Sequence, residues 1–312
     1  MKNKKMPEAQ SEKLYQELLP EFLFNKDVPE TLYHYTSSAG LIGIIESSKI
    51  WATKTTYLND SSELQLTFDY IREEVEIQKK NSIKKHDGFN HDDLLSLLDS
   101  IGNVNVSVAS FSAKGDLLSQ WRGYSKIGDG YSLGFDGNKL KKFIGNLTTN
   151  FGDKFYLVPC QYEPEIHKKL AANFVNHFIA TNISRESPDF ESFDRSTKHA
   201  YFEQNILIIA QIIKSKAFEQ EEEWRLISPG LPYSDAKFRI GKHALIPYWE
   251  IDLNIMNTLK SVIIGPTPES RLSHGAVYGI LTKKGFSTHP YIDTPEFNKI
   301  TIENSRIPYR HI

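Results

Sequence analysis

Hydrophobic residues recur along the chain with two different periods, one typical of strands and one typical of helices. Segments of the two kinds divide the chain into strand-rich and helix-rich blocks. Apolar residues at every second position indicate strands, as where Val104, Val106 and Val108 alternate with polar neighbours. Runs rich in β-branched or aromatic side chains and bounded by turn residues indicate further strands. The strands predicted in this way cover residues 32–37, 51–53, 104–112, 130–135, 155–162, 223–228, 243–246 and 262–264.

Apolar residues that recur every three to four positions predict amphipathic helices between these strands. The clearest runs to about residue 80 and has an apolar stripe of Leu64, Phe68, Ile71 and Val75. Further helices are predicted at residues 12–24, 39–45, 94–101 and 269–284, and over most of 165–216 with a break at 184–188.

The order of these elements favours an α+β fold with a mixed, mainly antiparallel central sheet, because strands and helices come in blocks instead of alternating singly. Residues 1–30 are predicted to form an N-terminal helical extension. Residues 31–312 are predicted to form a single α+β domain with a helical insertion at about 164–217. The segment 128–130, Gly-Asp-Gly, is predicted to make a hairpin turn.

Composition places the chain among ordinary globular proteins. It has 312 residues, of which 39% are hydrophobic, enough for one large core or two modest ones. The formal net charge of −2 gives no overall field to attract nucleic acid or an anionic membrane, so such contacts would need a local patch. No apolar stretch reaches membrane-spanning length, and the basic start at residues 1–6 lacks a hydrophobic signal core. We therefore expect a cytoplasmic protein with no membrane partner.

The single cysteine narrows the candidate chemistry. Cys160 cannot form an intrachain disulfide, and one cysteine cannot build a cysteine-cluster metal site. It follows the apolar run 156–159, so we expect a buried thiol and no nucleophile.

His34 lies where a predicted strand meets a predicted helix. Ser37 or Ser38 is suited to cap that helix, because a hydroxyl oxygen accepts from the first unpaired amides. A histidine held at a helix N-terminus is placed for anion or sugar recognition. The alternative is a structural histidine that is hydrogen-bonded within the fold.

Two acidic pairs are prominent in the sequence, and a structural role accounts for the first of them. Asp60 and Glu63 have the spacing of a capping box, which predicts a structural role at the start of a helix. Glu221, Glu223 and Arg225 alternate, so an extended strand would place all three on one face. The alternative for the second pair is a solvated acidic run that pairs with Arg225.

Residues 116–124 mix polar and aromatic side chains in a way that neither period explains. Segments that break the local rules tend to be functional.

Several short motifs together resemble the bacterial family called domain of unknown function 2971 (DUF2971). The family name implies a relative without implying a reaction. The motifs are 34–36 (His-Tyr-Thr), 58–60 (Leu-Asn-Asp) with Glu63, 110–112 (Ser-Phe-Ser), 119–121 (Ser-Gln-Trp), and Phe218 with Glu221 and 223–225 (Glu-Trp-Arg).

The segment 34–36, followed by a short helix and an aromatic strand, also looks like the first NAD-binding element of ADP-ribosyltransferases of the His-Tyr-Glu type. Tyr35 stands where those enzymes have a glycine that lies against the nicotinamide. The resemblance implies an NAD-using enzyme, either an ADP-ribosyltransferase or an NAD glycohydrolase. Cleavage passes through an oxocarbenium-like state, which a nearby carboxylate stabilises.

The same resemblance implies roles for individual residues. Glu223 would be the catalytic carboxylate, and His34 would contact the ribose. Trp51 or Tyr57 would stack on the nicotinamide. The cofactor-binding set implied in full is His34, Tyr35, Thr36, Trp51, Tyr57, Ser110, Ser112, Gln120, Trp121 and Arg225, with no metal ligand.

Two other function classes stay open from the sequence. A metal-dependent nuclease would hold Mg²⁺ through Asp116, Glu221 and Glu223, although no lysine occupies the usual activating position. A non-enzymatic module would use residues 119–122 and Tyr124 to bind a nucleotide, nucleic acid or protein. A nucleotide-type small molecule is the expected ligand. The sequence does not identify a protein or nucleic acid as the acceptor of ADP-ribose.

Overall fold

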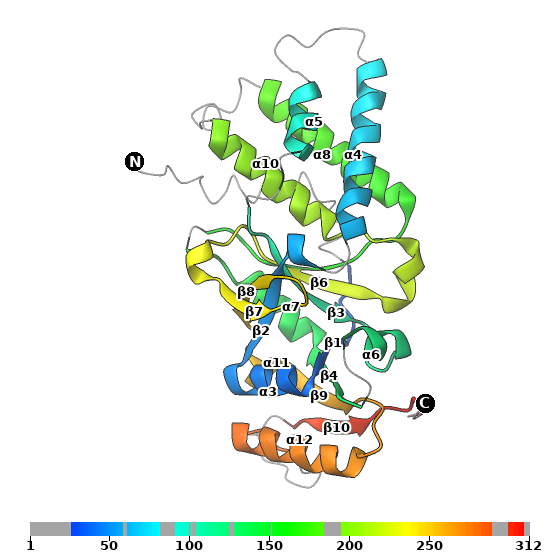
Figure 1. Ribbon diagram of the computed structural model, residues 1–312, viewed down its shortest axis with the longest axis vertical. Coiled ribbons are helices and arrows are strands. Elements are labelled where there is room, and N and C mark those ends of the chain that lie inside the picture. The colour runs from blue at the N-terminus through cyan, green and yellow to red at the C-terminus, as the bar shows by residue number, and fades with distance from the viewer. Residues whose placement is uncertain are drawn as a thin grey trace.

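The computed structural model describes residues 26–58, 61–81, 91–99, 101, 104–124, 128–150, 152–183, 195–288 and 299–308. The helix predicted at 12–24 and the break predicted at 184–188 lie outside these residues. Figure 1 shows an elongated molecule in which α4, α5, α8 and α10 gather at one end, α12 lies at the other end, and the strands lie between them.

The strands form one ten-stranded sheet with the order β10-β9-β4-β1-β3-β2-β8-β7, and β6 pairs with β3 and β5 off this path. Every pair is antiparallel except β9 with β10, so the predicted α+β fold with a mixed, mainly antiparallel sheet is confirmed. The strands are β1 Thr31–Ser37, β2 Lys49–Lys54, β3 Ser107–Ser112, β4 Gly130–Asp136, β5 Tyr156–Pro159, β6 Glu223–Ile227, β7 Lys237–Ile240, β8 Leu245–Asp252, β9 Leu259–Ile264 and β10 Thr301–Asn304.

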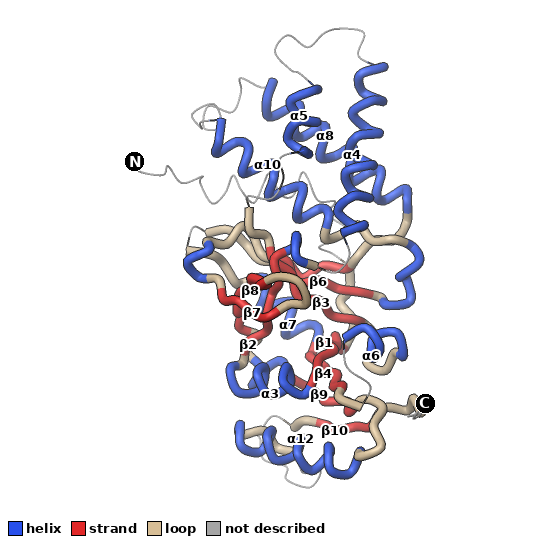
Figure 2. Tube along the Cα trace, in the orientation of Figure 1, coloured by secondary structure: helices blue, strands red, loops and turns tan. Residues whose placement is uncertain are grey.

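Helices cover the sheet on both faces, as the tube in Figure 2 also shows. Within the described ranges, no helix has the length and apolar character needed to span a lipid bilayer. The helices are α3 Ser38–Ser47, α4 Ser61–Asn81, α5 His91–Asp99, α6 Leu118–Tyr124, α7 Gly137–Gly145, α8 Pro164–Ile183, α10 Arg195–Ala210, α11 Ile255–Thr258 and α12 Ser270–Lys284, with 3-10 helices η1 Thr55–Tyr57, η2 Lys216–Glu221 and η3 Tyr233–Asp235.

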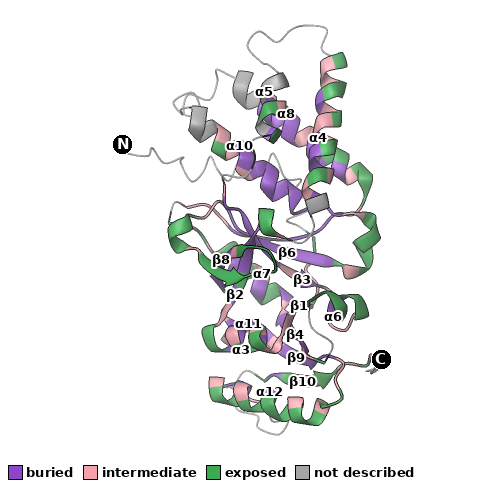
Figure 3. Cartoon of the chain, viewed as in Figure 1, coloured by how far each residue is buried: buried purple, intermediate pink, exposed green. Residues whose placement is uncertain are grey.

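Alternating side chains of the central strands fill two cores, one on each face. On β6, Ile227 packs into the core formed with α4, α5, α8 and α10, whereas Trp224 and Leu226 pack into the core on the other face. All of β6 is buried (Figure 3). Because side chains alternate along a strand, Glu223 and Arg225 share the face of Ile227 and point toward the helices.

The two edges of β3 are used differently. One edge pairs with β6 along its length, from Val108 to Ser112. The other edge is shared, because β2 pairs at Ser107 and Val108 while β1 pairs at Ser112. The sheet therefore divides at the middle of β3, between β1 and β2.

Some elements differ from the sequence prediction. Residues 118–124 form the helix α6, so the Gly-Asp-Gly segment at 128–130 follows a helix and makes no hairpin; β4 pairs instead with β1 and β9. β3 begins at Ser107, later than predicted. β7 was not predicted, because all four of its residues are exposed and no buried alternation marks it.

Candidate functional site

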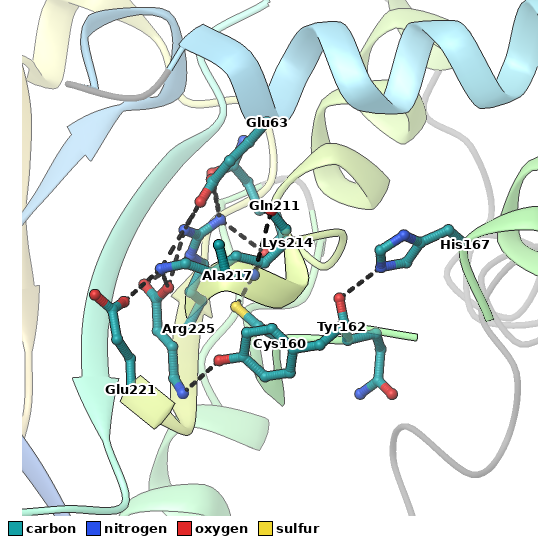
Figure 4. A network of polar contacts seen from close by, with 12 residues as sticks. Glu63, Cys160, Tyr162, His167, Gln211, Lys214, Ala217, Glu221 and Arg225 are labelled. Atoms are coloured by element: carbon teal, nitrogen blue, oxygen red, sulfur yellow. Dashed lines mark hydrogen bonds and ion pairs between the residues drawn. The ribbon is translucent and has the colours of Figure 1, made fainter. Parts of the chain in front are cut away.

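Five charged side chains from distant parts of the chain meet on the helix-facing side of β6 (Figure 4). We call them the charge cluster. It contains three carboxylates and two cations, an excess of one negative charge when all are ionised. Its members are Glu63 from the first turn of α4, Lys214 after α10, Glu221 from η2, and Glu223 and Arg225 from β6.

Arg225 is the centre of this cluster and its donors are fully used. Its Nε and Nη2 atoms donate to the two carboxylate oxygens of Glu223 at 2.8 and 3.0 Å. Its Nη1 and Nη2 atoms lie 2.8 and 3.0 Å from the carboxylate of Glu63. The Nη1 atom also donates to the carbonyl of Gln211 at 3.1 Å. With five N–H bonds engaged and 4% of its surface exposed, Arg225 fixes the two glutamates rigidly.

Glu223 is held in its ionised form. Burial alone would raise the pKa of its carboxyl, but Arg225 and Lys214 outweigh burial and lower the pKa to about 2. Glu63 also binds Arg225, but burial, with a smaller contribution from the charge of Glu223, raises the pKa of its carboxyl against the opposing effects of Arg225 and Lys214. The pKa values of the two buried glutamates therefore shift in opposite directions.

Lys214 connects the buried and the outer carboxylates. Its Nζ donates to Glu221 at 2.7 Å and forms a very short contact with Glu223. Burial acts to lower the pKa of Lys214, but Glu223 outweighs this effect and raises it. Lys214 thus stays charged, and its Nζ lies 5.2 Å from the centre of the Phe218 ring.

The backbone between the two glutamates makes this arrangement possible. Glu222 has a φ of 42° and ends η2 in the left-handed region, where non-glycine residues are uncommon. On either side of this turn, the Glu221 and Glu223 side chains both reach the Lys214 ammonium. Backbone strain of this kind is concentrated at functional sites.

The outer side of the cluster reaches the surface next to α6. The Glu221 side chain is 17% exposed, and Phe218 and Tyr124 are 40% and 49% exposed. Burial, followed by the charge of Glu223, raises the pKa of Tyr124 to about 12. An acidic group and two partly exposed aromatic rings therefore lie on the outer side of the cluster.

Ser112 and Lys114 connect residues 221 and 222 to the end of β3. The Ser112 hydroxyl donates to the carbonyl of Glu221 at 2.6 Å and accepts from the amide of Lys114 at 3.0 Å. Lys114 also pairs with Glu222 at 3.1 Å. Of the residues predicted to bind a cofactor, the structure brings Ser112 and Arg225 to Glu223, and register places Ser110 opposite Arg225.

His34 lies on the other face of the sheet. Its ring is 5.8 Å from Phe111, which pairs with Trp224, whereas Glu223 pairs with Ser112. Its Nδ1 bonds to the carbonyl of Ser110 at 2.8 Å, at the point where β1 and β2 separate. The structure does not bring His34 to Glu223. Its neighbour at the helix start, Ser38, donates to Asp129, which occupies the position expected for an anion.

Tyr35 and Trp121 form a separate contact with each other. Their rings meet edge to face at 4.7 Å, and both are buried. The Tyr35 hydroxyl donates to the carbonyl of Lys114 and accepts from the amide of Leu117, at 2.7 and 3.0 Å. The Trp121 indole donates to Asp116 at 2.8 Å. These groups are engaged in holding the loop between β3 and α6.

The remaining predicted cofactor residues have surroundings of their own. Gln120 is buried in α6, and the Thr36 hydroxyl leaves no room for a side chain at Gly40. Trp51 on β2 is 46% exposed and stacks on Tyr248 at 4.3 Å. Tyr57, at the end of η1, is 40% exposed.

Two members of the cluster were not predicted from the sequence. Glu63 had the spacing of a capping box, and in the structure its carboxylate bonds to Arg225. Asp60 lies outside the described residues. Lys214 gave only a weak signal, a lysine directly after the apolar run 206–213. Glu63 and Arg225 are more than 150 residues apart in the sequence, so no local sequence pattern predicts that they pair.

The carboxylates of the nuclease alternative do not converge. Asp116 binds Trp121, Ser305 and the amide of Arg306, while Glu221 and Glu223 share Lys214. Among the described residues, no three histidine, cysteine, aspartate or glutamate side chains are placed to hold a metal ion. Cys160 is buried as predicted, and burial raises the pKa of its thiol.

Comparison with known proteins gives a family for part of the chain. Residues 120–226 match the model of the family described as protein of unknown function DUF2971. The predicted DUF2971 resemblance is confirmed over this segment. The DUF2971 segment begins at Gln120 and ends at Leu226, so it contains Lys214, Glu221, Glu223 and Arg225. No curated protein and no solved structure matches the chain.

Proposed function

We propose that the protein is an NAD-using enzyme that cleaves the bond between nicotinamide and ribose, as an ADP-ribosyltransferase or an NAD glycohydrolase. The observation that carries this proposal is the fixed negative charge of the charge cluster. Glu223 is ionised at neutral pH, and beside it Glu221 presents a second carboxylate to solvent. Cleavage creates an oxocarbenium-like state with positive charge on the sugar. A carboxylate held in place before the reaction stabilises that charge without rearranging.

The two glutamates have different parts in this proposal. Glu221 faces the sugar, because its side chain is the more exposed of the two. Glu223 is the positioning residue: it holds Lys214, and Lys214 in turn orients Glu221 through a 2.7 Å hydrogen bond. Glu63 and Arg225 fix Glu223 from behind.

The surroundings of Glu221 suit the rest of the substrate. The exposed rings of Tyr124 and Phe218 offer apolar faces for the nicotinamide. Lys114 and Arg122 are exposed cations on the same side of the sheet and would hold the pyrophosphate. His34 is not part of the reacting set in this proposal; it closes the gap between β1 and β2.

Release of nicotinamide from NAD tests the proposal. The purified protein is incubated with NAD, with and without a bacterial lysate as a source of acceptors, and nicotinamide is measured by chromatography. Glu221→Gln removes the outer charge and should lower the rate on the order of 100-fold. Glu219→Gln is the matched control, because Glu219 is an acidic, exposed residue of the same 3-10 helix and is not a member of the charge cluster.

Two results would overturn the proposal. The first is a folded wild-type protein that releases no nicotinamide under either condition. The second is a Glu221→Gln rate equal to that of wild type. Thermal unfolding of each variant shows that a lost rate reflects the site and not the fold.

A further inference from the structure

The hairpin formed by β7 and β8 is the most exposed apolar element of the described chain. Ile240 is 92% exposed, Leu245 64% and Phe238 56%. Among all large apolar side chains in the described ranges, only Leu272 on α12 reaches comparable exposure. Isolated exposed leucines are common on protein surfaces, but three together on one hairpin indicate an interaction site.

Charge is distributed just as unevenly here. Residues 237–249 contain two lysines, one arginine, one histidine and no acidic residue, although the whole chain has a net charge of −2. The Lys237 side chain is 57% exposed and reaches Glu250 on β8 at 2.7 Å. Arg239 is exposed and donates to Thr53 on β2 at 3.1 Å. The hairpin therefore offers one cationic face and, by alternation, one apolar face.

The backbone of β7 is open on its outer edge. β7 is the last strand of the sheet path and pairs only with β8 in the described chain. Phe238 stands opposite Pro247, which has no N–H to donate, so this pair is of the type that exchanges no hydrogen bonds. The backbone hydrogen bonds to β8 are then made by Lys237 and Arg239. The N–H and C=O groups of Phe238 and Ile240 point away from β8, toward the open edge of the sheet.

These three features define one kind of partner. We propose that β7 accepts an extended protein segment as an added strand, and that this segment alternates acidic and apolar side chains. Its backbone pairs with Phe238 and Ile240, its acidic side chains lie beside Lys237 and Arg239, and its apolar side chains cover Phe238 and Ile240. The site lies apart from the charge cluster and does not depend on NAD chemistry.

Other occupants account for fewer of these features. Natural edge strands often carry lysine to prevent pairing, but an edge guarded in that way does not expose isoleucine and phenylalanine to this extent. A second copy of β7 would place Lys237 and Arg239 beside the same cations of its partner. A nucleic acid would match the cations and leave Ile240 and Leu245 uncovered.

Binding of designed peptides to the full-length protein tests the proposal. Fluorescently labelled eight- to twelve-residue peptides that alternate Glu or Asp with Val, Ile or Phe are titrated and followed by anisotropy. At least one should bind saturably, and its version with alternate backbone amides N-methylated on the pairing edge should bind at least about tenfold more weakly. Peptides alternating Lys with Val are the charge control.

Phe238→Pro removes one outward N–H without touching the ladder to β8, because proline is tolerated on an edge strand where its nitrogen faces solvent. This variant should also bind about tenfold more weakly. The control is Leu272→Ala on α12, where the leucine side chain is about as exposed as that of Leu245. This variant should bind the peptides as wild type does. Thermal unfolding confirms that both variants are folded.

Three results would overturn the proposal. The first is that no alternating acidic peptide binds. The second is that binding is unaffected by N-methylation and by Phe238→Pro. The third is that Phe238→Pro instead abolishes self-association in sedimentation, or binding of an oligo-dT strand, which would assign the edge to a second copy or to nucleic acid.

Discussion

The charge cluster buries its charged residues and pairs them with one another, whereas the β7–β8 hairpin exposes its charged residues to solvent. In the cluster, Arg225 is 4% exposed and all its donors are engaged within the fold. In the hairpin, Arg239 is exposed and contacts a single hydroxyl, that of Thr53. Burying a charged group costs free energy unless its donors are paired within the fold, whereas an exposed charged group stays hydrated and contributes little to stability. The comparison separates groups that hold the fold from groups that are available to a partner.

Arg225→Ala should break this comparison most strongly. It removes the guanidinium that Glu63 and Glu223 share and leaves these two buried carboxylates with Lys214 as the remaining cation of the cluster, so we expect a loss of about 3–5 kcal/mol in the free energy of unfolding. Urea denaturation measures this value. Arg239→Ala on the hairpin is the matched control and should change stability by less than about 0.5 kcal/mol. Equal effects of the two substitutions would mean that the cluster does not hold the fold.

Acid should weaken the protein through Glu223. Its folded pKa of about 2 lies below the ordinary value of 4.5, so its contribution is fully present above pH 4.5 and is lost as the pH falls toward 2. This difference corresponds to roughly 3 kcal/mol. Urea denaturation between pH 2 and pH 6 measures the loss. Glu223→Gln should flatten the profile, and a wild-type profile that is already flat would contradict the assigned pairing.

Tyr35→Phe tests a buried polar contact outside the cluster. The substitution removes the hydroxyl that joins the carbonyl of Lys114 and the amide of Leu117, and it leaves the contact with Trp121 in place. We expect a loss of about 1–3 kcal/mol, because a buried amide is left without its acceptor. Tyr278→Phe, on an exposed face of α12, is the control and should be neutral. Stability equal to wild type would show that water replaces the hydroxyl.

Ile240→Ser should have the smallest effect on the fold. Its side chain is 92% exposed, so the change in free energy of unfolding should lie within about 0.5 kcal/mol of wild type. Ile206→Ser, in the core between the helices, is the contrast and should destabilise strongly. A clear destabilisation by Ile240→Ser would mean that the hairpin edge is covered in solution.

The sequence predicted those parts of the fold that have a regular local period. The apolar stripe of α4 was predicted correctly because buried positions recur at the helical period there. β4 and β6 were predicted correctly because they are short runs rich in apolar side chains, nearly all of them buried. α6 and β7 were missed for opposite reasons. α6 is short and buries a polar residue, Gln120, while β7 buries nothing.

The candidate site was only partly predictable. Alternation predicted that Glu221, Glu223 and Arg225 lie on one face of an extended strand. This is confirmed for Glu223 and Arg225 on β6, but it is wrong for Glu221, which lies in η2 before the left-handed turn at Glu222. The partnership of Glu63 with Arg225 depends on how α4 docks onto the sheet, which no local pattern contains. The contacts of Lys214 with both Glu221 and Glu223 depend on the left-handed turn at Glu222. The sequence does not predict this turn, because residue 222 is a glutamate and not a glycine.

Calorimetric titration with NAD tests the central claim, that the surface around Glu221 is a substrate site. Tyr124 and Tyr278 are matched in exposure, at 49% and 45%, but only Tyr124 borders the charge cluster. We predict saturable binding to wild type and to Tyr278→Ala, and binding at least about tenfold weaker to Tyr124→Ala, because a stacking wall is lost. Absence of saturable binding to the folded wild-type protein, or equal affinity in both variants, would contradict the account.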